Sequence, residues 1–302
     1  MKKNNNECAR AAYINKCIEA MLPAPSGDVV ENNRDFDFEC FQSDYEIIDD
    51  MYDVTGFESD FILIKDLFSC SGQECCNAPI RKNDIMRQLV VIDSLYSTNI
   101  NRMRVFALEE ICDKIWALCS NGSGNHTLGN LISRINDTQA LDSGICALFS
   151  SSYGYMKGLP AGNAYSLISK YLYFATIACP IDKWGFPIYD SIAKKMMRKV
   201  QRFLGIPVTS DMQNKFDIDA YIAGLKSIIE TLEKNNPNLW ANLPVLKFQL
   251  LDYFLWHIGK AGEGSYSLLL SKKEVLTCYK GGVIVKLPHR IAYWKDVYNK
   301  LK

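Results

Sequence analysis

The stretch that is most informative about the fold is Gly158-Leu159-Pro160-Ala161-Gly162-Asn163-Ala164-Tyr165-Ser166-Leu167-Ile168-Ser169-Lys170-Tyr171-Leu172-Tyr173-Phe174. It is followed, after Cys179-Pro180, by Trp184-Gly185-Phe186-Pro187-Ile188-Tyr189-Asp190-Ser191-Ile192-Ala193. Its first part reads as a turn that leads into a strongly apolar helix. Lys170 is the only charged residue between Lys157 and Asp182. A lysine in an apolar setting loses hydration, which lowers its pKa and makes the amine a usable nucleophile near neutral pH.

The second part of the stretch places Asp190 at the start of a helix. Pro187 keeps the preceding residues out of a helix, and an amphipathic helix begins at Ser191, so Asp190 occupies the N-cap position. There its carboxylate is ionised and held by backbone amides. A purely structural alternative stays open, in which Asp190 is only a cap and Lys170 extends its amine to the surface.

The rest of the chain is dominated by helical periodicity. The sequence predicts a mainly α fold, and 273–286, around Gly281-Gly282, is the only stretch that favours a β-hairpin. A domain boundary is expected near residue 80, which separates an acidic N-terminal region, 1–80, from a helical region, 81–302, with its core at 158–204. The predicted helices span 6–21, 84–97, 103–119, 127–136, 164–178, 191–204, 217–234 and 243–260.

Composition narrows the functional class. The chain has 302 residues, of which 48% are hydrophobic, and no stretch reaches the ~18 apolar residues that a membrane span needs. Its start leads into an amphipathic segment rather than a signal-peptide core, so we expect a cytoplasmic protein without a membrane partner. Eleven cysteines, an odd number spread along the chain, are interpreted as reduced thiols. No metal or cofactor is expected, because the cysteines and the three histidines lack ligand spacing and no Gly-rich phosphate loop is present.

The net charge of zero hides an asymmetry. Residues 1–80 hold 6 Lys and Arg against 16 Asp and Glu, which leaves 28 against 18 for residues 81–302. A basic region of this kind favours a polyanion partner, because Lys and Arg displace counterions from phosphates. The alternative is ordinary scatter of surface charge.

Lys170 and Asp190 together carry a resemblance to a known family. A lysine about twenty residues ahead of a helix-capping aspartate, joined by an apolar helix and a Pro-containing turn, resembles the helix-hairpin-helix DNA glycosylases, in particular their 8-oxoguanine glycosylase-like branch. Within that branch, Ser169-Lys170-Tyr171-Leu172 and Phe186-Pro187-Ile188-Tyr189-Asp190-Ser191 are similar to a group of bacterial relatives. The resemblance covers roughly residues 90–260, and about thirty of these carry most of it.

The resemblance implies a reaction and a fold, a helix-hairpin-helix helical bundle. In such enzymes the target nucleotide is flipped out of double-stranded DNA, the lysine attacks C1′, and a Schiff base permits strand cleavage. Lys170 then acts as the nucleophile, and Asp190 positions it and stabilises positive charge on the sugar. The aromatic candidates for the base pocket or for insertion into the duplex are Tyr96, Trp184, Tyr189 and Trp256; aromatic residues at helical spacing are also common in a plain core.

The hairpin departs from the family pattern. The family has a Leu-Pro-Gly-hydrophobic-Gly turn whose amides bind a DNA phosphate, with the lysine directly after it. Here the nearest equivalent is Leu159-Pro160-Ala161-Gly162-Asn163, and Lys170 lies several residues later. The candidates for phosphate binding are Gly162, Asn163, Lys194, Lys195 and Arg198, and a solvated helix face explains the last three equally well.

These observations lead to one expectation and two alternatives. We expect a monomeric DNA glycosylase, with or without lyase activity, that excises a damaged or modified base of the 8-oxoguanine type. The first alternative is a non-catalytic DNA-binding protein with the same fold. The second is a helical interaction or defence-associated protein, whose acidic N-terminal region meets a protein partner.

Overall fold

The structure is a computed structural model. It describes residues 2–22, 57–68, 76–95, 100, 104–122, 124–135, 141–155, 162–180, 182–208, 217–262 and 287–301. Within these ranges the chain is mainly helical, with twelve helices. The predicted hairpin at 273–286 and Tyr96 both lie outside the described residues.

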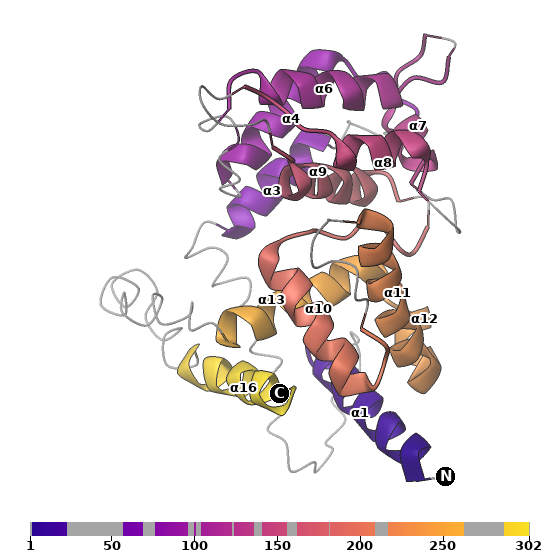
Figure 1. Ribbon diagram of the computed structural model, residues 1–302, viewed down its shortest axis with the longest axis vertical. Coiled ribbons are helices and arrows are strands. Elements are labelled where there is room, and N and C mark those ends of the chain that lie inside the picture. Colours follow the sequence, from indigo (N-terminus) through magenta and orange to yellow (C-terminus); the bar gives the residue numbers. More distant parts are fainter. Residues whose placement is uncertain are drawn as a thin grey trace, which may run out of the picture.

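The helices form two groups, one above the other (Figure 1). The chain passes from the upper group to the lower one through residues 179–190, which connect α9 to α10 (Figure 1). The upper helix group consists of α3 (Phe57–Phe68), α4 (Lys82–Leu95), α6 (Ala107–Leu118), α7 (Leu128–Ser133), α8 (Ser143–Ser150) and α9 (Tyr165–Ala178). The lower helix group consists of α1 (Lys2–Glu19), α10 (Ser191–Leu204), α11 (Ile218–Asn235), α12 (Pro237–Ala241), α13 (Lys247–Gly262) and α16 (Leu287–Lys300).

The predicted mainly α class is confirmed, and each of the eight predicted helices is present. The agreement is closest for α10, which begins and ends at the predicted residues. Asp190 caps its N-terminus, and Gly205, in the left-handed backbone conformation, follows its last residue. Four helices were not predicted: α3, α8, α12 and α16. In the described part of the chain, β pairing is limited to isolated bridges.

Helix α9 is the central element of the upper group. It packs against α3, α4, α7 and α8, and its residues 167–176 are all buried. A helix that is apolar on every side requires this position, because an exposed face would leave large side chains in water. Tyr171 is buried with the rest, and its hydroxyl donates to Gln88 Oε1 on α4 at 2.9 Å.

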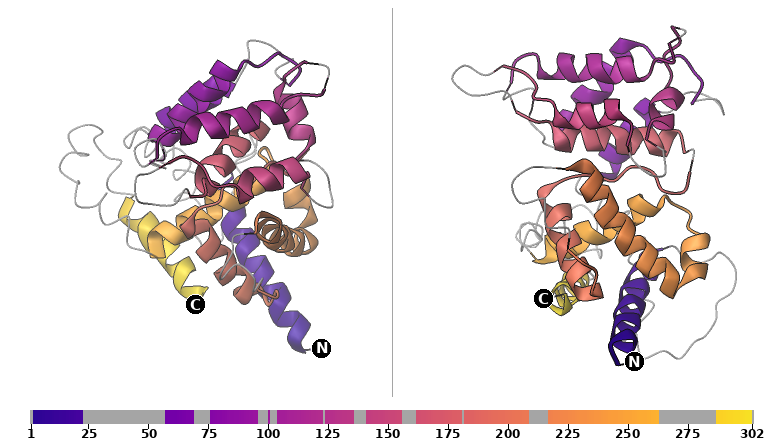
Figure 2. Two further views of the ribbon diagram at one scale, coloured as in Figure 1. Left: turned by 45° about the horizontal axis from the view of Figure 1, so that its top comes forward. Right: turned by 45° about the vertical axis from the view of Figure 1, so that its right-hand side comes forward.

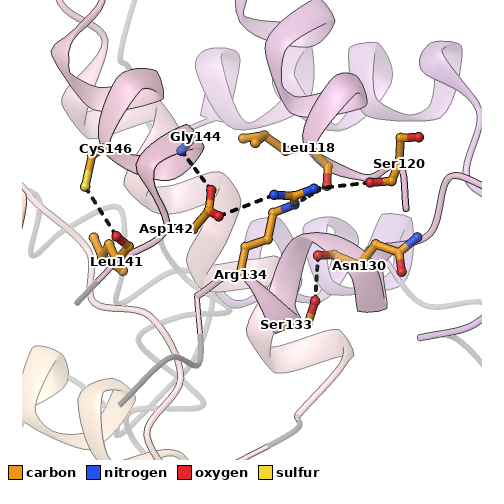
Figure 3. A network of polar contacts seen from close by, with 9 residues as sticks. All are labelled: Leu118, Ser120, Asn130, Ser133, Arg134, Leu141, Asp142, Gly144 and Cys146. Atoms are coloured by element: carbon orange, nitrogen blue, oxygen red, sulfur yellow. Dashed lines mark hydrogen bonds and ion pairs between the residues drawn. The ribbon is translucent and has the colours of Figure 1, made fainter. Parts of the chain in front are cut away.

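A second set of contacts fixes the short helices of the upper group. The Arg134 guanidinium donates to the carbonyl oxygens of Leu118 and Ser120, at 3.0 and 3.3 Å, and pairs with Asp142 at 3.4 Å (Figure 3). Asp142 also caps α8 by accepting from Gly144 N at 2.7 Å. One arginine therefore satisfies the carbonyl end of α6 and orients the cap of α8.

The lower group brings the two ends of the chain together. In both views of Figure 2, α1 lies against α10 and α11. Asn15 on α1 donates to Leu232 O at 2.8 Å and accepts from Trp240 Nε1 at 2.9 Å. α10 and α13 approach closely, because a Cβ at Gly259 would lie 2.2 Å from Ile192 Cγ2. Two helices of the acidic N-terminal region thus pack into the helix groups, α1 in the lower and α3 in the upper.

The cysteines differ from the expectation in one respect. The sequence interpretation treats all of them as reduced thiols, but the structure joins Cys76 and Cys179 in a disulfide, with their Cα atoms 5.2 Å apart. The two residues are 103 positions apart in sequence, and their proximity arises only when the end of α9 packs beside the segment before α4. Among the described residues, no helix is long and apolar enough to cross a membrane.

Candidate active site

Lys170 lies in the first half of α9 and is buried. Only 7% of the residue is exposed, and its Nζ donates to Ser166 Oγ, one turn earlier, at 3.0 Å. Loss of hydration lowers its pKa below the ordinary value, while Asp190 and Asp252 act in the opposite direction. The burial of Lys170 argues against the alternative in which its amine extends to the surface, although the amine itself has polar neighbours.

Asp190 begins α10 and faces the same region. Its Oδ1 accepts from Ala193 N at 2.6 Å, as the sequence predicts for an N-cap. The preceding residues are tied to α9, because Ser169 Oγ accepts from Tyr189 N at 2.9 Å. Ile188 is held from the other side, where Tyr221 Oη donates to its carbonyl oxygen at 2.8 Å. Two neighbouring helices therefore fix the position of the aspartate relative to the lysine.

A third ionisable group, Asp252 on α13, completes the cluster. The residue keeps some exposed surface, but burial of its carboxyl group raises the pKa well above the ordinary value. The negative charge of Asp190 raises this pKa further, whereas Lys170 lowers it. Asp252 is thus disposed to hold its proton to a higher pH than an ordinary aspartate. The resulting cluster, Lys170, Asp190 and Asp252, contains one amine and two carboxyl groups with different environments.

Asp252 was missed by the sequence analysis, although a signal for it exists. It is the only Asp, Glu, Lys or Arg between Lys247 and Lys260, in an otherwise apolar helix. This is the same isolation that singled out Lys170. Its connection to Lys170 is not visible in the sequence, because the two residues are far apart in the chain.

The aromatic candidates lie in three different settings. Tyr189 is half-buried beside Asp190 and makes edge contacts with Tyr165 and Tyr221, at ring distances of 5.9 and 5.2 Å. Trp256 is one helical turn after Asp252, which places both on one side of α13.

Trp184 is directed toward other residues. Its ring packs against Phe248 at 5.4 Å, and the Nζ of Lys247 lies 4.6 Å from the ring centroid. These contacts make Trp184 a packing residue at the start of α13. Of the aromatic candidates, Tyr189 and Trp256 are therefore the two that neighbour the cluster in sequence and on their helices.

Gly162 and Asn163 lie just before the N-terminus of α9. Tyr153 N donates to Gly162 O at 3.0 Å, and Asn163 Nδ2 donates to Ser151 O at 3.1 Å. The guanidinium of Arg104 packs on Gly162 so closely that a Cβ there would lie 2.2 Å from Nη2. Both residues therefore make hydrogen bonds that hold the start of α9 against residues 151–153.

Lys194, Lys195 and Arg198 follow one side of α10. They line a groove with Tyr189 and Ser191, the two residues that flank Asp190. The structure thereby places three of the predicted phosphate-binding residues next to the cluster.

No protein-family model, curated protein or solved structure matches this chain.

Proposed function

We propose that this chain is a DNA glycosylase that excises a damaged or modified base of the 8-oxoguanine type, with Lys170 as the nucleophile. The observation that carries the proposal is a buried lysine with a lowered pKa beside a helix-capping aspartate. A lowered pKa enlarges the fraction of neutral amine at a given pH, and the neutral amine is the state in which lysine can attack carbon. The resemblance of the Lys170 and Asp190 stretches to the helix-hairpin-helix family supplies the substrate class, double-stranded DNA.

The proposed reaction uses each member of the cluster. The lone pair of Lys170 Nζ forms a bond to C1′ of a flipped-out nucleotide, while the bond from C1′ to the base breaks and its electron pair leaves with the base. The carboxyl group of Asp190 stabilises the positive charge that develops on the sugar. Asp252 holds a proton that can pass to the departing base. Nζ then loses a proton, the bond from C1′ to O4′ breaks with its electron pair on O4′, and O4′ takes up that proton. The sugar ring is thereby opened and a Schiff base remains, from which lyase cleavage can follow.

Further expectations belong to this proposal. The protein acts as a monomer in the cytoplasm, and its acidic N-terminal region is a candidate surface for a protein partner. The partner of the basic region is duplex DNA. A helix-hairpin-helix glycosylase-like fold is proposed for the helical bundle, with α9 as the helix that carries Lys170.

Borohydride trapping tests the reaction. The purified chain is incubated with duplex oligonucleotides that carry 8-oxoguanine, an abasic site or an undamaged base, and borohydride reduces any imine to a stable adduct. We expect an adduct on the modified duplexes that is absent with Lys170→Gln. A matched control, Lys183→Gln, changes an exposed lysine and retains trapping. Failure of the wild-type chain to trap any substrate, with DNA binding intact, contradicts the excision chemistry and favours the non-catalytic DNA-binding alternative.

A further inference from the structure

Ser166 is the polar neighbour that α9 itself supplies to Lys170. The two residues are four positions apart, so their side chains lie on one face of the helix, and a long side chain on a helix points back toward the N-terminus. Lys170 Nζ accordingly donates to Ser166 Oγ at 3.0 Å. Ser166 is only half-buried, whereas residues 167–176 are all buried. Ser166 therefore connects the buried amine to the more exposed start of α9.

The hydroxyl group of Ser166 keeps its own proton available. A serine hydroxyl has one proton to donate and two lone pairs that accept. The hydrogen bond from Lys170 uses the accepting side, and among the described residues no acceptor takes the proton of this hydroxyl. Ser166 can thus receive a proton from one atom while it gives its own proton to another, and it remains unchanged overall.

The other groups near the amine have different roles. Ser169 Oγ accepts from Tyr189 N at 2.9 Å and donates to Ser166 O at 3.1 Å, so both of its sides are in use. The charged groups that act on the amine are Asp190 and Asp252. Asp190 caps α10 through Oδ1, and in the proposed reaction Asp252 gives its proton to the departing base. The transfer of a proton away from Nζ therefore falls to Ser166.

We propose that Ser166 carries the proton that leaves Lys170 Nζ during Schiff-base formation to the oxygen atom on the attacked carbon. In the proposed reaction this oxygen is O4′. The bond from Nζ to hydrogen breaks and its proton binds to Oγ, while the original proton of Oγ passes to O4′. The bond from C1′ to O4′ breaks with its electron pair on O4′, and the nitrogen lone pair completes the C=N bond. Because Oγ contacts the reacting nitrogen, Ser166 is a catalytic residue.

The inference rests on the proposed function for its substrate, but the proton transfer is not restricted to DNA. When an amine attacks a small aldehyde, the first adduct has a positive nitrogen and a negative oxygen on neighbouring atoms. The same movement of one proton from Nζ to Oγ, and of another from Oγ to the oxygen, gives a neutral carbinolamine. Loss of water then gives the imine. Ser166 can thus be tested with formaldehyde and without any nucleic acid.

Reductive methylation of the folded full-length chain is the first test. Formaldehyde and cyanoborohydride methylate a lysine through its imine, and mass spectrometry of peptides compares Lys170 with the exposed Lys234 in one digest. We expect Ser166→Ala to lower the rate at Lys170 about tenfold relative to Lys234, because positioned proton transfer contributes a factor of this order or more. Ser166→Thr restores a hydroxyl and recovers most of the rate. The matched control is Ser227→Ala, which removes a half-buried hydroxyl that donates to Gly224 O on α11 and leaves the rate at Lys170 unchanged.

A purely structural hydrogen bond predicts the opposite sign. Ser166 accepts from the amine and so stabilises its charged form, and loss of this acceptor would enlarge the fraction of neutral amine. A rate at Lys170 that is unchanged or faster in Ser166→Ala therefore overturns the inference, as does a Ser166→Thr variant as slow as Ser166→Ala. A wild-type chain that is methylated at Lys234 but not at Lys170 overturns it as well. Thermal unfolding checks that each variant is folded.

Borohydride trapping on an abasic duplex separates this inference from the glycosylase proposal. At saturating duplex we expect Ser166→Ala to trap about tenfold more slowly than wild type, with an unchanged Kd for the duplex. A wild-type chain that fails to trap, with methylation of Lys170 that still depends on Ser166, rejects the glycosylase and retains the role of Ser166. A wild-type chain that traps, with Ser166→Ala at the same rate, retains the glycosylase and rejects the role of Ser166.

Discussion

Replacing Asp190 by asparagine separates the two roles that this residue has. Asp190 caps α10 through one hydrogen bond, from Ala193 N to Oδ1 at 2.6 Å, and its negative charge raises the pKa of Lys170. Asparagine is as good an N-cap as aspartate, but it carries no charge. Asp190→Asn therefore removes the charge and keeps the cap, whereas Asp190→Ala removes both.

The expected magnitudes differ between the two variants. Loss of the cap in Asp190→Ala lowers the free energy of unfolding by about 1 kcal/mol, and Asp190→Asn stays near wild type. In both variants the rate of borohydride trapping falls about 100-fold or more, because the positive charge on the sugar loses its counter-charge. Burial lowers the pKa of Lys170, and the charge of Asp190 partly offsets that effect. Without this charge the pKa of the amine falls further, so the rising limb of the pH–rate profile moves to lower pH.

The assay combines urea unfolding with trapping rates on an abasic duplex across pH. The reasoning is refuted if Asp190→Asn traps at the wild-type rate, or if its pH limb moves to higher pH. A loss of stability in Asp190→Asn as large as that in Asp190→Ala would also refute the separation, since it would show that the charge contributes to the fold.

Three other predictions concern stability. Lys170→Met is expected to raise the free energy of unfolding at neutral pH, because it removes the cost of burying a charged amine. In the wild type this cost is full below the lowered pKa of Lys170 and vanishes above 10.5, the pKa of an ordinary lysine. Urea unfolding should therefore show the gain in stability shrinking as pH rises. Reduction of the Cys76–Cys179 disulfide, which closes a loop of about 100 residues, is expected to lower the free energy of unfolding by about 2–4 kcal/mol, and a Cys76→Ser variant whose melting temperature still responds to reductant would contradict this origin. Tyr171→Phe leaves the buried Gln88 Oε1 without its hydroxyl donor and is expected to destabilise the chain by about 1–3 kcal/mol, a result that chemical denaturation can check against Tyr155→Phe at an exposed position.

Helices with strong local signals were predictable from the sequence. α10 combines an N-cap, a left-handed C-terminal glycine and an amphipathic pattern, and each of these acts within a few residues. α8 was missed because the helix has only eight residues and all of them are apolar or small. Periodicity therefore gives little information there. α3 was missed because it lies in a stretch that composition marks as acidic.

The candidate site divides in the same way. The isolation of Lys170 in an apolar helix and the capping position of Asp190 are local properties, and the sequence determined both. The tertiary structure decided that Asp252 joins them and that Cys76 meets Cys179. The reason is physical: a cap or an apolar face depends on neighbours along the chain, whereas burial and pKa depend on which distant helices pack around a side chain.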